Sequence, residues 1–223
     1  MHRTPGSLIA LISLICVPQV VCQTAVSEPL RWVSDIERFE AADRRHFPVA
    51  GSIVFAGSSS IAMWQTLNKD FGYVPVLNRG IAGSTLHDNV QSADRIVLPY
   101  KPPIVVLYSG ENDLEEGRTP AQVLQEFQAF ISIMHAKLPA TRVVFVSIKP
   151  SIARWRLADS IRETNRLIKD YTGKDKRLGY VDVFTPMLDA SGRPMRDLFL
   201  ADGLHMNARG YSIWRKLIQP TLR

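Results

Sequence analysis

The chain has 223 residues, of which 46% are hydrophobic, and this is enough for a domain with its own core and excludes an extended disordered protein. Its formal net charge of +6 comes from 27 basic and 21 acidic residues that are interleaved along the chain, so we expect a solvated surface and no nucleic-acid partner. No internal repeat is present, which excludes a solenoid.

The first 25 residues have the pattern of an export signal. The basic Arg3 precedes an apolar run over residues 8–21, which is shorter than the ~20 residues needed to cross a bilayer. We therefore predict a signal peptide over residues 1–25 and a single domain over residues 26–223 that is secreted or periplasmic. After cleavage of the signal, no stable membrane span is expected.

Two cleavage sites fit this signal, one after Cys22 and one after Ala25. A lipid anchor on Cys22 is the alternative, although Val21 is bulkier than the residue that usually precedes a lipid-modified cysteine. Because the second cysteine, Cys16, also lies within the signal, we expect no disulfide and no thiol chemistry in the domain.

Motifs for metals and nucleotide cofactors are absent from the sequence. There is no His-x-x-x-His pair, no Gly-x-Gly-x-x-Gly motif and no P-loop, so we expect neither a metal nor a cofactor. Apart from His205, no histidine has a carboxylate at a useful spacing; His87, which opens a predicted helix, can face an active-site mouth.

In chain order, Ser27 is expected to cap a first helix that ends near residues 46–48. Short apolar runs then predict five strands, at residues 52–56, 74–77, 104–108, 143–147 and 180–183. Segments with helical spacing lie between and after them, at residues 86–96, 119–138, 157–171 and 207–217. Val- and Ile-rich strands that alternate with helices indicate an α/β fold, a three-layer α/β/α sandwich around a five-stranded parallel sheet.

Glycine and small polar residues follow the first three predicted strands, and a fourth polar loop precedes the last helix. In open parallel sheets, function gathers at the carboxyl ends of the strands. The four segments are GSSS at residues 57–60, NRGIAGST at 78–85, SGEND at 109–113 and DGLHMN at 202–207.

These segments contain the residue types that ester hydrolysis through an acyl-enzyme requires. Ser59 or a neighbouring serine can be the nucleophile at a strand-to-helix turn. His205 follows Asp202 by three residues, so one loop can carry both the base and the acid that orients it. Gly83 leaves its backbone N–H open, and Asn112 offers an amide donor. Each segment alone is more often a plain turn or a helix cap, so the hypothesis rests on all four together.

In order and spacing, the four segments resemble the signature of the SGNH, or GDSL-type, hydrolases over nearly the whole predicted domain. The resemblance implies a flavodoxin-like sheet, with Ser59 as the nucleophile and Asp202 and His205 completing a triad. It also implies an oxyanion hole formed by Ser59, Gly83 and Asn112. At one position the chain departs from the family, because Ser58 stands where an aspartate is usual, and this bears on loop geometry and rate more than on the reaction class.

We therefore predict an exported serine esterase that acts on a small-molecule, glycan or lipid ester. Two alternatives stay open: an O-acyltransferase on the same fold, and a catalytically silent carbohydrate-binding module, which only the departure at Ser58 motivates. A set of apolar residues can line the substrate cleft or belong to the core. It comprises Met63, Trp64, Trp155, Met187, Leu188, Phe199 and Leu200.

Overall fold

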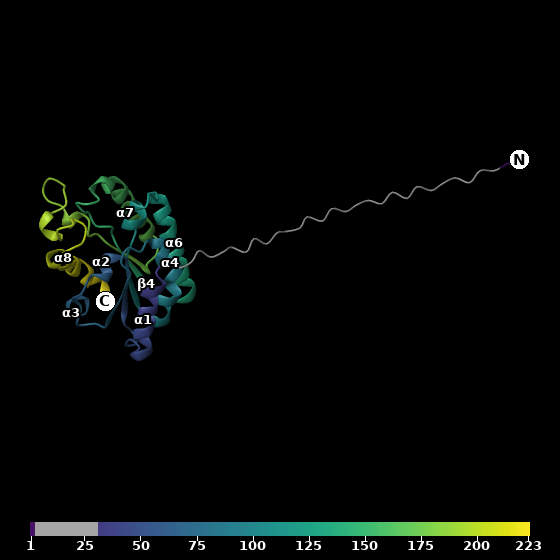
Figure 1. The fold of residues 1–223 in the computed structure, drawn as a ribbon, viewed down its shortest axis with the longest axis horizontal. Coiled ribbons are helices and arrows are strands. Elements are labelled where there is room, and N and C mark those ends of the chain that lie inside the picture. Colours follow the sequence, from purple (N-terminus) through teal and green to yellow (C-terminus); the bar gives the residue numbers. More distant parts are fainter. Residues whose placement is uncertain (3–30) are drawn as a thin grey trace.

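The computed structural model describes residues 1–2 and 31–223. Nearly all of the predicted export signal lies outside the described residues, together with both cleavage sites, Cys22 and the expected helix cap Ser27. The described chain folds as an α/β protein in which helices cover both faces of a five-stranded, all-parallel sheet (Figure 1). This confirms the predicted fold class.

All five predicted strands are present, and they lie in the order β2-β1-β3-β4-β5. This order is the flavodoxin-like arrangement. The second strand is added on one side of β1 and the later strands on the other side, so the topological switch point lies between β1 and β3. The strands are β1 (Ile53–Gly57), β2 (Val76–Gly80), β3 (Ile104–Tyr108), β4 (Arg142–Val146) and β5 (Leu178–Val181).

Two strands begin two residues away from their predicted starts, for local reasons: β2 begins later and β5 begins earlier. Pro75 has no N–H to donate to the ladder, so β2 begins at Val76, which pairs with Ile53 of β1. At the other edge, β5 ends at Val181 because the N–H groups of Val183 and Phe184 donate to the Ser147 hydroxyl instead of to β4.

The helices form two layers, one on each face of the sheet (Figure 1). One layer contains α1 (Val33–Arg45), α4 (Leu86–Ile96), α6 (Pro120–Lys137) and α7 (Ala158–Thr172). The other contains α2 (Ser59–Ala62), α3 (Leu67–Asp70) and α8 (Ala208–Ile218). Successive strand residues face opposite layers, as Val54 and Phe55 do, so each face has its own apolar core.

The predicted helix ranges agree best where a side chain caps the first turn. Thr85 and Asp88 form a reciprocal capping box at the start of α4, and Thr119 and Gln122 form another at the start of α6. The first helix begins later than expected, at Val33. Helical spacing predicted neither α2 nor α5 (Glu111–Glu115), because one turn is too short to establish a periodic pattern.

Five short 3-10 helices complete the described elements. They are η1 (Leu98–Tyr100), η2 (Trp155–Leu157), η3 (Thr185–Met187), η4 (Arg196–Leu198) and η5 (Gln219–Leu222).

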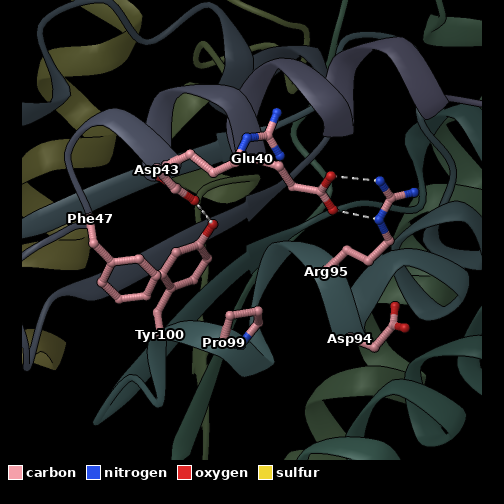
Figure 2. Close-up of a pocket in the computed structure, with 8 residues that line it drawn as sticks. Glu40, Asp43, Phe47, Asp94, Arg95, Pro99 and Tyr100 are labelled. Atoms are coloured by element: carbon pink, nitrogen blue, oxygen red, sulfur yellow. Dashed lines mark hydrogen bonds and ion pairs between the residues drawn. The ribbon is translucent and has the colours of Figure 1, made fainter.

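Polar contacts fasten α1 to the end of α4 and to η1 (Figure 2). Glu40 accepts two hydrogen bonds from Arg95, at 2.7 and 2.9 Å, and Asp43 accepts one from the Tyr100 hydroxyl. Asp43 also pairs with the buried guanidinium of Arg79. A cavity of about 360 Å³ is bordered by Glu40, Asp43, Arg95 and Tyr100, where α1 and η1 lead toward the starts of β1 and β3. The cavity therefore lies near the amino-terminal ends of the strands, away from their carboxyl ends.

Candidate active site

The turn after β1 places Ser59 at the first position of α2. Gly57 permits this turn, because its φ is +130° and a Cβ atom there would lie 1.8 Å from the carbonyl oxygen of Tyr108. The N–H of Ser58 donates to that same oxygen at 3.0 Å, and the N–H of Ile81 donates to the Gly57 carbonyl at 2.8 Å. The turn is thus bound by backbone contacts to both neighbouring strand ends.

The three consecutive serines differ in accessibility. Ser58 and Ser60 are buried, whereas Ser59 is partly exposed. Ser58 is the N-cap residue of α2 with an extended backbone, φ −91° and ψ −158°, and its side chain makes no capping hydrogen bond. Backbone hydrogen bonds therefore hold this turn, and a serine occupies the position where an aspartate is usual.

His205 contacts both Ser59 and Asp202. Its Nε2 lies 3.2 Å from the Ser59 hydroxyl oxygen, although the two residues are 146 positions apart. Its Nδ1 lies 2.7 Å from Oδ2 of Asp202, whose Oδ1 accepts the backbone N–H groups of Leu204 and His205. The hydrogen bond from His205, assisted by these backbone donors, lowers the pKa of Asp202 to about 2.

The ionised Asp202 determines how the imidazole can act. A carboxylate only accepts hydrogen bonds, so Nδ1 of His205 carries the proton in this contact. In the neutral ring, Nε2 is then the acceptor that faces the Ser59 hydroxyl. This is the arrangement that a general base requires.

The loop that follows β4 supports the loop that carries His205. The N–H groups of Ile152 and Ala153 donate to the Gly203 carbonyl at 2.9 and 3.1 Å. Asn207 caps α8, as the sequence predicts, by accepting from the N–H groups at Arg209 and Gly210. The histidine loop is therefore held on both sides.

Gly83 and Asn112 lie after the two strands that flank β1. Gly83 follows β2, is exposed and has a φ of +83°, and Asn112 follows β3 at the second position of α5. Nδ2 of Asn112 donates to the Ser84 carbonyl at 2.9 Å, which connects the two loops. Because β1 lies between β2 and β3, these two donor groups lie at strand ends on opposite sides of the turn that carries Ser59.

Comparison with known proteins identifies the chain. The GDSL-like lipase/acylhydrolase family matches residues 50–213, a range that contains all four predicted segments. The chain belongs to this family. It is therefore a hydrolase that acts on esters.

Solved structures share the fold of this GDSL-like hydrolase at low sequence identity. A GDSL-like lipase from Bacteroides thetaiotaomicron is 21% identical, with a TM-score of 0.72, and the match covers 84% of this chain and 96% of that one. A carbohydrate esterase of family 3 from Talaromyces cellulolyticus is 20% identical, with a TM-score of 0.61 and coverage of 77% and 96%. None of the curated proteins compared with the chain matches it.

Sequence reasoning missed a buried charged cluster in this hydrolase. Oε2 of Glu111 accepts hydrogen bonds from the Lys149 ammonium at 2.5 Å and from the Tyr108 hydroxyl at 2.8 Å, and Oε1 accepts from the Ser151 hydroxyl at 3.2 Å. Burial raises the pKa of Glu111, but the charge and hydrogen bond of Lys149 outweigh this and bring it below its usual value. The side chain of Lys149 is only 1% exposed, and burial lowers its pKa. No local pattern links residues this far apart in the chain.

The apolar residues considered for the cleft divide between the core and the surface. Trp64, Met187 and Phe199 are buried, and Leu188 packs against the core. The ring of Trp155 lies near two guanidinium groups, those of Arg162 and Arg193, at 5.3 and 5.8 Å from the ring centroid. The two residues with exposed side chains are Met63 and Leu200.

His87 does have a carboxylate partner, contrary to the expectation from sequence spacing. Its Nδ1 lies 3.0 Å from Oε1 of Glu126, which comes from α6, and helix packing rather than sequence spacing brings them together. Within residues 1–2 and 31–223, no three His, Cys, Asp or Glu side chains are grouped as a metal site requires. None of the helices in the described part of the chain has the length and apolar character that a membrane span requires.

Proposed function

We propose that the chain is an exported serine esterase that hydrolyses a carboxylic ester through an acyl-enzyme on Ser59. The observation that carries the proposal is the position of His205, whose two ring nitrogens contact the Ser59 hydroxyl and the Asp202 carboxylate. Export is proposed because residues 1–25 have the pattern of a signal peptide. The alternative is an exported protein that a lipid on Cys22 anchors to a membrane.

In the first step, Oγ of Ser59 attacks the ester carbonyl carbon while Nε2 of His205 accepts its proton. Asp202 holds the ring in the required tautomer and stabilises the imidazolium that forms. The tetrahedral intermediate then collapses, the bond to the leaving alcohol breaks, and His205 donates the proton to that alcohol.

In the second step, water repeats the attack on the acyl-enzyme. His205 accepts a proton from the water, hydroxide adds to the acyl carbon, and the proton passes to Oγ of Ser59 as the acid is released. Serine and histidine thus return to their initial states, and no cofactor takes part.

Three donors are proposed to stabilise the oxyanion in both steps. They are the backbone N–H groups of Ser59 and Gly83 and one N–H of the Asn112 carboxamide. The first N–H groups of a helix have no acceptor within the helix, so the N–H of Ser59 at the start of α2 is free for this role. Loss of one such donor typically reduces kcat by about 10²- to 10³-fold.

Exposed apolar residues whose backbones are hydrogen-bonded to the segments of Ser59 and His205 favour an ester with an apolar acyl or alcohol group. The backbone N–H groups of Met63, Leu200 and Ile152 donate to the carbonyls of Ser59, His205 and Gly203, and all three side chains are exposed. A small-molecule, glycan or lipid ester can present such a group, and the similar solved structures include both a lipase and a carbohydrate esterase.

The test is hydrolysis of nitrophenyl esters with acyl chains from two to twelve carbons by the mature protein. We expect turnover to be lost in Ser59→Ala and in His205→Ala, and to be retained in the matched control Ser132→Ala on the exposed side of α6. A Ser59→Ala variant as active as the parent protein would overturn the proposal.

Two other outcomes identify the alternatives. Transfer of the acyl group to an added alcohol or sugar, in preference to water, would identify an O-acyltransferase. Glycan binding by a folded protein without turnover would identify a carbohydrate-binding module.

A further inference from the structure

We propose that Arg154 is a positioning residue that holds and polarises the oxyanion donor Asn112. This inference rests on the function proposed above and adds a residue that lies outside the four signature segments. Arg154 belongs to the loop between β4 and η2, and its side chain is 16% exposed. Its Nη1 donates a hydrogen bond to Oδ1 of Asn112 at 2.9 Å.

This contact determines which end of the Asn112 carboxamide faces which neighbour. A guanidinium group only donates hydrogen bonds, so it must face the carboxamide oxygen. The other end, Nδ2, donates one of its two protons to the Ser84 carbonyl at 2.9 Å. The second proton of Nδ2 remains for a substrate oxygen, and the carboxamide is held at both ends in the orientation that presents it.

The charge of Arg154 also makes Asn112 a stronger donor. A cation on the carbonyl oxygen of an amide draws electron density from its nitrogen, and hydrogen bonds linked in this way strengthen one another. The benefit is greatest when negative charge develops on the substrate oxygen, in the transition state rather than in the bound substrate.

Two carboxylates of α5 keep the guanidinium in place. Nε of Arg154 lies 3.4 Å from Glu115, and Nη1 lies 3.9 Å from Oε1 of Glu111. Glu111 and Glu115 are four positions apart, so they project from one face of the helix that also carries Asn112. Glu111 is in turn paired with the buried Lys149. Arg154 is therefore connected to the protein interior and not only to surface residues.

The same loop also contacts the histidine loop. Ile152 and Ala153, which directly precede Arg154, donate their backbone N–H groups to Gly203, between Asp202 and His205. One short segment thus contacts both the loop that carries the proposed base and the proposed oxyanion donor. The backbone of this segment contacts the histidine loop, and the side chain of Arg154 contacts Asn112.

The first test is Arg154→Met, which keeps much of the aliphatic side chain and removes its donors. We expect kcat for a nitrophenyl ester to fall by about 10- to 100-fold while KM changes little, because the lost interaction acts in the transition state. Arg154→Lys should recover part of the rate, since an ammonium can still donate to Oδ1. The matched control is Arg156→Met, because Arg156 pairs with Glu115 at 2.5 Å but not with Asn112.

A double-substitution cycle separates positioning from a merely structural role. If Arg154 acts through Asn112, then Arg154→Met should lower kcat no further once Asn112→Ala is present. Independent, multiplying losses would overturn the inference, as would full activity of Arg154→Met in a protein that still requires Ser59. Loss of the Ser59 requirement would instead overturn the proposed esterase itself.

Should Arg154→Met fail to fold, Arg154→Gln and Arg154→Lys serve in the same cycle. Each keeps a donor group and is expected to show a smaller loss that disappears in the Asn112→Ala background. A loss that persists there would overturn the inference.

Discussion

At the scale of single residues, the carboxylate of Asp202 determines the tautomer of His205. The pKa of Asp202 is lowered to about 2, chiefly by its hydrogen bond with His205, so it is ionised across the range in which an esterase works. As an acceptor only, it holds the proton on Nδ1 and leaves Nε2 toward Ser59.

Asp202→Asn should therefore reduce kcat on the order of 10⁴-fold with little change in thermal stability. The amide can donate to Nδ1, which favours the tautomer whose proton lies on Nε2 and which cannot accept from Ser59. Steady-state hydrolysis and thermal unfolding check this expectation. The control is Asp197→Asn, which removes a nearby carboxylate that pairs with Arg209. Equal activity of the two variants would contradict the role given to Asp202.

At the scale of secondary-structure elements, a buried carboxylate joins two helices of the site. Asp113, from α5, is fully buried and accepts the N–H of Leu86 at the start of α4, at 3.1 and 2.9 Å from its two oxygens. Burial, opposed in part by this backbone contact, raises the pKa of Asp113 to about 6. The folded protein therefore binds this proton more tightly than the unfolded chain does.

The sign of the resulting pH dependence follows from that difference. Because the folded-state pKa is above the ordinary value of 3.8, the contribution to stability is present below that value and is lost as pH rises through about 6. The difference in unfolding free energy between the wild type and Asp113→Asn should fall by about 2 kcal/mol between pH 4 and pH 7. Urea unfolding at several pH values measures this difference. A difference that does not vary with pH would contradict it, and Asp94→Asn on α4 is the exposed control.

At the scale of the whole molecule, α8 anchors the carboxyl-terminal part of the chain to the sheet through Trp214. This side chain is fully buried, with its ring centroid 4.8 Å from that of Tyr108 in β3 and 6.0 Å from that of Trp64 beyond α2. The helix directly follows the loop of His205, so the same packing that completes the core also brings the base to the end of β1.

Trp214→Ala should reduce the unfolding free energy by about 3–5 kcal/mol, because it leaves a large cavity among aromatic rings. Trp214→Phe, which fills most of that space, should cost less. Denaturant unfolding of both variants measures the two losses. A loss below about 1 kcal/mol in the alanine variant would show that α8 is not anchored in this way.

The sequence predicted those features that depend on neighbouring residues. The capping boxes at Thr85 and Thr119 act within four residues, and they mark helix starts that agree with the expectation. The starts and ends of β2 and β5 were less accurate, because Pro75 and the Ser147 hydroxyl redirect hydrogen bonds that no apolar pattern reveals. The segments that contain Ser59, Gly83, Asn112 and His205 were found because each lies at the end of a strand or the start of a helix.

The α/β fold class and the family could both be predicted from the sequence, because they depend on short segments whose order along the chain is visible directly. Contacts between distant residues could not be predicted in this way. They are the contacts of His205 with Ser59, of Glu111 with Lys149, of His87 with Glu126 and of Arg154 with Asn112. The two kinds of feature differ in the sequence separation over which their interactions act. Capping, turn geometry and apolar alternation act over a few residues, whereas these contacts join side chains 38 to 146 positions apart and exist only once the strands lie side by side.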